Sequence, residues 1–275
     1  MMNGLALCAR TVPQASLPER IELAARHGFS HVSMMGHDVI AILAGELPVA
    51  VVHDLLATHE IAIAELDAVV EWLPSAEPVP AEMRSPAGEA EFHVVADAFG
   101  ATMMNVVDLV AGPTPPLDAC AAAFGAVCDR AAAHDLRVGI EFVPWTRVPD
   151  LATAAAIVER ADRPNGGVML DTWHLFRGGG SVTDVAAVPA ELIVGIQVND
   201  APEAERNARV YQAVQHRLLP GDGVIGVAAI LADLDARGCT APIGCEVTSA
   251  ELAARAADEV AALVAEAARR VSPSP

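Results

Sequence analysis

Short apolar runs and helical segments alternate eight times along the chain, and this alternation is the strongest constraint on its fold. Apolar runs of this length with helices between them are typical of buried parallel strands. Eight such units in about 250 residues predict a single (β/α)8 TIM barrel. The expected strands are 4–10, 31–35, 61–69, 101–110, 137–142, 166–171, 192–198 and 242–247.

The expected helices are 16–27, 45–59, 88–99, 117–134, 150–161, 181–187, 224–238 and 249–271. Ser16 with Glu19 three residues later forms the pattern of a capping box. The barrel is expected to cover residues 1–271, and the Ser-Pro-Ser-Pro tail 272–275 to be disordered. An open doubly wound sheet is the competing fold. A dinucleotide-binding fold of that kind requires a glycine-rich loop after the first strand, and residues 8–13 contain no glycine.

Composition excludes several kinds of function. The chain has 36 acidic and 17 basic residues, for a formal net charge of −19. A polyanion would be repelled, so we expect no nucleic-acid partner. None of the basic residues is a lysine. Schiff-base aldolases, pyridoxal phosphate enzymes and P-loop proteins need that amine, so all three are excluded.

The expected location of the protein is the cytoplasm. No apolar run approaches the roughly 20 residues of a membrane helix, so no membrane partner is expected. No basic region precedes the first apolar stretch, as it would in a secretory signal. The five cysteines lack CxxC spacing and are expected to be reduced and mostly buried.

Polar residues stand at the carboxyl ends of four consecutive expected strands, the fifth to the eighth. In a barrel these positions converge on one pocket. Burying several carboxylates together is costly unless a cation joins them. Oxygen ligands suit Mg²⁺ or Mn²⁺, and an added histidine moves the preference towards Mn²⁺, Co²⁺ or Zn²⁺. The predicted ligands of a divalent metal, with Mn²⁺ favoured, are Glu141, Asp171, Gln197 and Glu246.

Further residues are expected to contact a substrate. His174 follows Asp171 by three residues and is a candidate metal ligand or substrate contact. Arg217 precedes the tight loop 220–223, where its planar guanidinium would meet a carbonyl, hydroxyl, carboxylate or phosphate. Trp145 lies just past Glu141, where its ring would form an apolar wall, and His37 follows the second strand.

At these residues the sequence resembles the sugar phosphate isomerase/epimerase family, the xylose isomerase-like TIM barrels. The resemblance covers nearly the whole chain. It rests on Glu141, on Asp171 with His174, on Gln197 before Asn199-Asp200, on Arg217 before Pro-Gly-Asp-Gly, and on Glu246. The match also makes Asp200 an expected substrate contact. The chain departs from the family at Gln197, because characterised ketose epimerases usually carry histidine there.

The resemblance implies a metal-dependent isomerase or epimerase of a sugar or related keto-polyol. Glu141 and Glu246 would then remove and return a proton next to a carbonyl through an enediolate intermediate. The alternatives are a dehydratase of a keto-sugar or inosose-like substrate, an abasic-site endonuclease, which the acidic charge disfavours, and a non-catalytic binding barrel. The expected partners are a small-molecule substrate and, from the family, a second copy in a homodimer.

Overall fold

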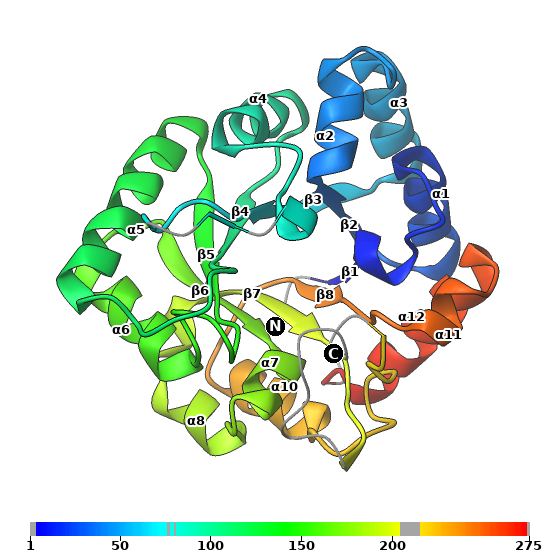
Figure 1. Ribbon diagram of the computed structural model, residues 1–275. Coiled ribbons are helices and arrows are strands. Elements are labelled where there is room, and N and C mark those ends of the chain that lie inside the picture. Colours follow the sequence, from blue (N-terminus) through cyan, green and yellow to red (C-terminus); the bar gives the residue numbers. More distant parts are fainter. Residues whose placement is uncertain (1–3, 76–77, 80, 204–214, 274–275) are drawn as a thin grey trace.

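Eight parallel strands close into a barrel, which confirms the predicted (β/α)8 fold (Figure 1). The computed structural model describes residues 4–75, 78–79, 81–203 and 215–273. The strands pair in sequence order, and β8 pairs with β1. They are β1 (Leu5–Leu7), β2 (His31–Met35), β3 (Ala62–Val69), β4 (Met103–Val107), β5 (Arg137–Glu141), β6 (Gly166–Asp171), β7 (Ile193–Val198) and β8 (Ile243–Cys245).

Helices surround the barrel (Figure 1). They are α1 (Leu17–His27), α2 (Gly36–Leu43), α3 (Val49–His59), α4 (Glu89–Phe99), α5 (Leu117–Ala131), α6 (Leu151–Ala161), α7 (Thr172–Arg177), α8 (Val182–Ala187), α10 (Val227–Ala236), α11 (Ala250–Ala253) and α12 (Ala257–Val271). No helix in the described part of the chain is long and apolar enough to cross a bilayer. Residues 274 and 275 of the predicted tail lie outside the described residues.

Several helical details differ from the prediction. The expected helix 45–59 begins at Val49, because Gly45 has a φ of 76° and Pro48 precedes the helix. Two additional helices, α2 and α7, start directly after β2 and β6. At the start of α2 the side chain of Asp38 accepts the backbone N–H of Met35. The expected helix 249–271 is divided into α11 and α12, because Ala256 is extended.

Large apolar side chains fill the barrel beneath its carboxyl end. Met103 and Met169 lie two residues before Asn105 and Asp171, so each pair faces the same side of the sheet. Both methionines pack with Val194 in a cluster separate from the main core. A Cβ on Gly195 would lie 2.5 Å from Cε of Met169, so glycine gives the methionine its space. The barrel is therefore packed below the polar residues at its mouth.

Candidate metal and substrate site

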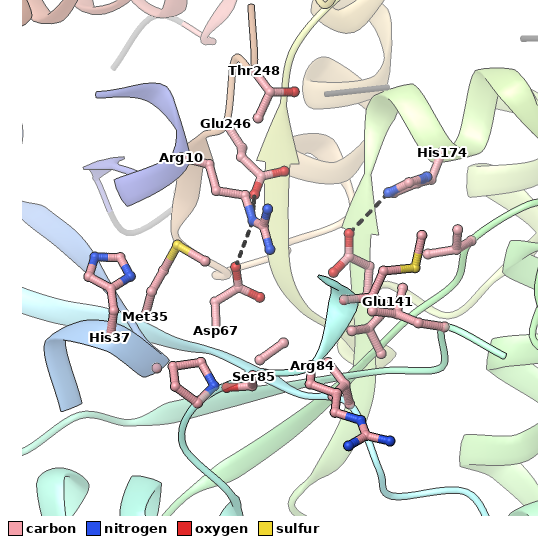
Figure 2. A pocket seen from close by; sticks show the side chains of 18 of the residues that line it. Arg10, Met35, His37, Asp67, Arg84, Ser85, Glu141, His174, Glu246 and Thr248 are labelled. Carbon is pink, nitrogen blue, oxygen red and sulfur yellow. Dashed lines mark ion pairs between the residues drawn. The ribbon is translucent and has the colours of Figure 1, made fainter. Parts of the chain in front are cut away.

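One cavity of about 570 Å³ lies in the mouth of the barrel and is lined by two of the predicted strand-end acids, Glu141 and Glu246. The other two predicted ligands, Asp171 and Gln197, are fully buried and do not line it. Figure 2 shows Glu246 beside Arg10 and Asp67, and Glu141 beside His174. The remaining wall is largely apolar. It is lined by Met35, Ala68, Val70, Met83, Pro86, Val107, Leu109, Val143 and Trp145. Such a cavity fits a small molecule with one polar and one apolar side.

Arg217 lies between two of the predicted metal ligands. Its Nη1 donates to Oδ2 of Asp171 at 2.8 Å and to Oε2 of Glu246 at 2.6 Å. Only 6% of Arg217 is exposed, so its guanidinium lies deeper than the expected place at the pocket mouth. Its ion pairs with the two acids raise the pKa of Arg217, although burial opposes this. In this arrangement the arginine is the counter-ion of both acids.

Glu141 and His174 form the second half of the site. Nε2 of His174 lies 3.3 Å from Oε1 of Glu141. Helix α7 holds the histidine there, because Oδ1 of Asp171 accepts the backbone N–H groups of Trp173 and His174. One ligand atom each from Glu141, Asp171 and His174 lies within 4.8 Å of the others. The predicted residues Glu141 and Asp171 are thus brought together, and His174 joins them.

A polar chain that the sequence analysis did not assign connects the two glutamates. Nε of Arg10 lies 3.6 Å from Oε1 of Glu246 and 3.7 Å from Oδ2 of Asp67. Nδ2 of Asn105 donates to Asp67 at 3.0 Å and to Glu141 at 2.7 Å. Asp67 lies near the end of β3 and Asn105 within β4, so strands of the first half of the barrel contribute to the site.

Gln197 faces Asp171 in the register between β6 and β7. Its Nε2 donates to Oε1 of Glu65 at 3.1 Å, and its Oε1 is buried without a hydrogen-bond partner in the described part of the chain. The acids Glu65 and Asp67 stand two positions apart on β3, so both point into the barrel. This alternation of acids in an apolar strand was the signal that could have revealed them.

The donor set fits a divalent cation. Five buried acids lie here, namely Glu65, Asp67, Glu141, Asp171 and Glu246. Among the described residues, Arg10 and Arg217 are the arginines that form ion pairs with members of this group. Burial and the neighbouring carboxylates raise the pKa of Glu246 to about 8, even though Arg217 opposes the rise. A further positive charge would relieve this repulsion. The unpartnered oxygen of Gln197 offers that charge another ligand.

The other two expected contacts lie on the cavity wall. Trp145 stands edge-on to His174, with ring centroids 5.8 Å apart, and it packs on Trp173 as well. It thus forms part of the apolar wall, next to the catalytic candidates. Figure 2 shows His37, on α2, on the other side of the cavity from His174, and 63% of its side chain is exposed.

Asp200 is absent from the cavity lining, which departs from its expected role as a substrate contact. Its Oδ1 accepts the N–H groups of Ala201 and Ile225, and Oδ2 accepts that of Gly221. A Cβ on Gly223 would lie 2.4 Å from Oδ1 of Asp200. Asp200 therefore anchors the loop that follows Arg217.

Asp200→Ala should lower the free energy of unfolding by about 1–3 kcal/mol, because three N–H groups lose their acceptor. Urea unfolding measures this loss. Asp222→Ala is the matched control on the same loop, since Asp222 makes an exposed ion pair with Arg270. That control should change stability by less than about 1 kcal/mol. Equal losses in the two variants would contradict the anchoring role.

Comparison with known proteins gives a family match. The family model described as xylose isomerase-like TIM barrel matches residues 21–269. Two curated relatives are 3-dehydroshikimate dehydratases, from Pseudomonas aeruginosa (35% identical over 123 residues) and Pseudomonas putida (31% over 121). These matches cover 44% and 43% of this chain, but the chain spans only 19% of either relative.

Solved structures share the fold over nearly the whole chain. The IolI protein with a bound zinc atom has a TM-score of 0.86 at 19% identity and covers 98% of both chains. D-allulose 3-epimerase from Methylomonas sp., in complex with D-allulose, has a TM-score of 0.75 at 17% identity, over 98% of this chain and 97% of that one. The probable 3-DHS dehydratase AsbF from Bacillus anthracis has a TM-score of 0.75 at 13% identity, over 97% and 98%. At these identities the likeness concerns the fold alone.

Proposed function

Because the chain belongs to the xylose isomerase-like TIM barrel family, we propose that it is a divalent-metal-dependent enzyme acting on a keto-polyol. The reaction that we favour is dehydration: a proton leaves the carbon next to a carbonyl, and the hydroxyl on the following carbon leaves as water. The observation that carries this proposal is the pairing of two buried glutamates with different neighbours at one cavity. Glu246 lies with arginines, and Glu141 lies with a histidine.

The proposed metal ligands are Glu141, Asp171, Gln197 and Glu246, with His174 beside them. When bound, a divalent cation there supplies the positive charge that polarises the substrate carbonyl and stabilises the charge left by the proton. The preference for Mn²⁺ remains a prediction.

Glu246 is the proposed base. Both oxygens of Glu141 have close neighbours, Asn105 at 2.7 Å and His174 at 3.3 Å. Among the described residues, the partner of Oε1 of Glu246 is Arg10, at 3.6 Å. Oε1 of Glu246 is therefore the better-placed acceptor for a substrate proton. The His174–Glu141 pair then donates a proton to the leaving hydroxyl, which departs as water. Arg217 and Trp145 hold the substrate against the site.

Two facts bear on the choice of reaction. Both curated relatives are 3-dehydroshikimate dehydratases, so 3-dehydroshikimate and related cyclic keto-polyols are the first substrates to test. Isomerisation or epimerisation is the second candidate. It is supported by the same two glutamates, Glu141 and Glu246, which Figure 2 shows in different parts of the cavity wall, so that one could remove a proton and the other return it.

Product analysis with the metal-loaded protein separates the candidates. We expect 3-dehydroshikimate or another cyclic keto-polyol to lose the mass of one water in the presence of Mn²⁺. A product of unchanged mass that carries deuterium after reaction in D₂O would establish isomerisation or epimerisation instead. Neither mass loss nor deuterium uptake across a panel of ketoses and cyclic keto-polyols would contradict both reactions. Asp171→Asn, which weakens the proposed metal site, is the negative control.

A further inference from the structure

We propose that Glu65 is a positioning residue that fixes the side-chain amide of Gln197 with its oxygen facing the cation site. This inference rests on the metal site of the proposed function. Glu65 belongs to β3, on the other side of the barrel interior from β7, and it is absent from the cavity lining. It would therefore act through Gln197 rather than on the substrate.

The contact between the two side chains is direct and buried. Nε2 of Gln197 donates to Oε1 of Glu65 at 3.1 Å, and the exposed fractions of the two residues are 0% and 3%. The amide nitrogen therefore has a partner, while the amide oxygen has none among the described residues. A buried, unpartnered carbonyl oxygen is costly, and a cation would satisfy it. The register places this amide next to Asp171, one of the proposed ligands.

Glutamine needs such a partner more than histidine or a carboxylate does. A half-turn about the Cγ–Cδ bond leaves the shape of the amide nearly unchanged, but it exchanges the acceptor oxygen for the donor nitrogen. An NH₂ group that faced the cation would exclude it. A carboxylate offers only acceptor oxygens, so its contact with Nε2 favours one of the two orientations. Sγ of Cys8, 3.6 Å from the same oxygen of Glu65, adds a weak second donor.

This arrangement resembles the carboxylate partners that orient metal-binding histidines, whose loss typically weakens metal binding about 10–100-fold. Here the oriented group is an amide oxygen, which is a harder ligand than imidazole. We therefore expect the site to accept Mg²⁺ and Mn²⁺ well relative to Zn²⁺. Without Glu65, the amide would present either face, and the site would lose affinity for these hard ions.

Two backgrounds separate orientation from charge. Glu65→Met fills a similar volume with at most a weak acceptor, and Gln197→Met removes the amide that Glu65 would orient. Metal-free protein is titrated with Mn²⁺ by calorimetry. We expect Glu65→Met to weaken binding about 10–100-fold when Gln197 is present, and to add less than about threefold when Gln197→Met is already in place. Cys8→Ala, which leaves the contact between Glu65 and Gln197 in place, should stay within about threefold of the wild type.

A Glu65→Met variant that binds Mn²⁺ as tightly as the wild type overturns the inference. An equal weakening by Glu65→Met with and without Gln197 also overturns it, because the charge of Glu65 alone would then explain the effect. A wild-type protein that binds no divalent ion contradicts the metal site itself, which is a separate failure. The unfolding temperature of each metal-free variant shows that the protein remains folded during the titration.

A second measurement needs no variant at position 65. In ¹⁵N spectra of the wild-type protein, Gln197→Met identifies the side-chain NH₂ signals of Gln197 by their loss. In a fixed, buried amide the two proton signals exchange slowly with water and persist when Mg²⁺ is added. Signals that exchange at the rate of a solvated amide would overturn the inference.

Discussion

Glu246→Gln is expected to lower kcat by about 1,000-fold, which is the typical size of a general acid–base contribution. Glutamine has the same shape but does not take up a proton at neutral pH. It also keeps one carbonyl oxygen as a ligand, so some metal binding should remain while turnover is lost. Steady-state kinetics on the substrate found by product analysis gives the size of the effect.

Glu251→Gln is the matched control for this change. Glu251 is an exposed glutamate on α11 that forms an ion pair with Arg255, and it has no proposed role in the reaction. Its substitution should leave kcat within about twofold, as expected for a surface change. A Glu246→Gln variant that retains more than a tenth of wild-type kcat with normal metal binding would remove Glu246 from the role of base.

Arg217→Met should lower the free energy of unfolding of the metal-free protein by about 3–5 kcal/mol, the usual result of removing one partner of a buried ion pair. Asp171 and Glu246 would then face each other without their shared cation. Added Mn²⁺ should restore part of the loss, because it supplies the missing positive charge. Urea unfolding with and without Mn²⁺ measures both effects.

The loss in Arg217→Met should also depend on pH. In the metal-free wild type the pKa of Glu246 is raised from 4.5 to about 8, so between these values the folded state binds more protons than the unfolded state. Stability attributable to this group therefore falls as pH rises through that window. Without Arg217 the pKa of Glu246 should rise further, so the loss should be larger at about pH 8 than at about pH 5. Arg160→Met, at an exposed ion pair, is the control and should show neither effect. If the loss of stability in Arg217→Met did not depend on pH, this would contradict the effect of Arg217 on the pKa of Glu246.

The sequence was sufficient to predict the barrel because its signal is local. Each strand is a short apolar run, and boundary residues such as Ser16 and Asp150 cap the following helices as expected from their type. The same locality explains why Glu141, Asp171 and Glu246 could be placed together. Each stands at the end of an apolar run, and the barrel brings such ends close to one another.

The rest of the site depends on contacts between distant strands. Glu65 and Asp67 lie within a strand whose sequence otherwise looks ordinary, and their partners Gln197 and Asn105 come from other strands. Arg217 was expected at the pocket mouth, yet it reaches the buried acids because Asp200 holds the following loop. A single sequence does not show such pairings, because they arise only when the barrel closes.

The metal content of the purified protein tests the central claim most directly. The account predicts about one divalent ion per chain by mass spectrometry, after dialysis, and a marked decrease in Asp171→Asn. It also predicts that metal-free protein unfolds at a higher temperature once Mn²⁺ or Mg²⁺ is added, because an ion that binds only the folded state stabilises that state. A protein that carries no metal and gains no stability from either ion would contradict the proposed site and the chemistry built on it.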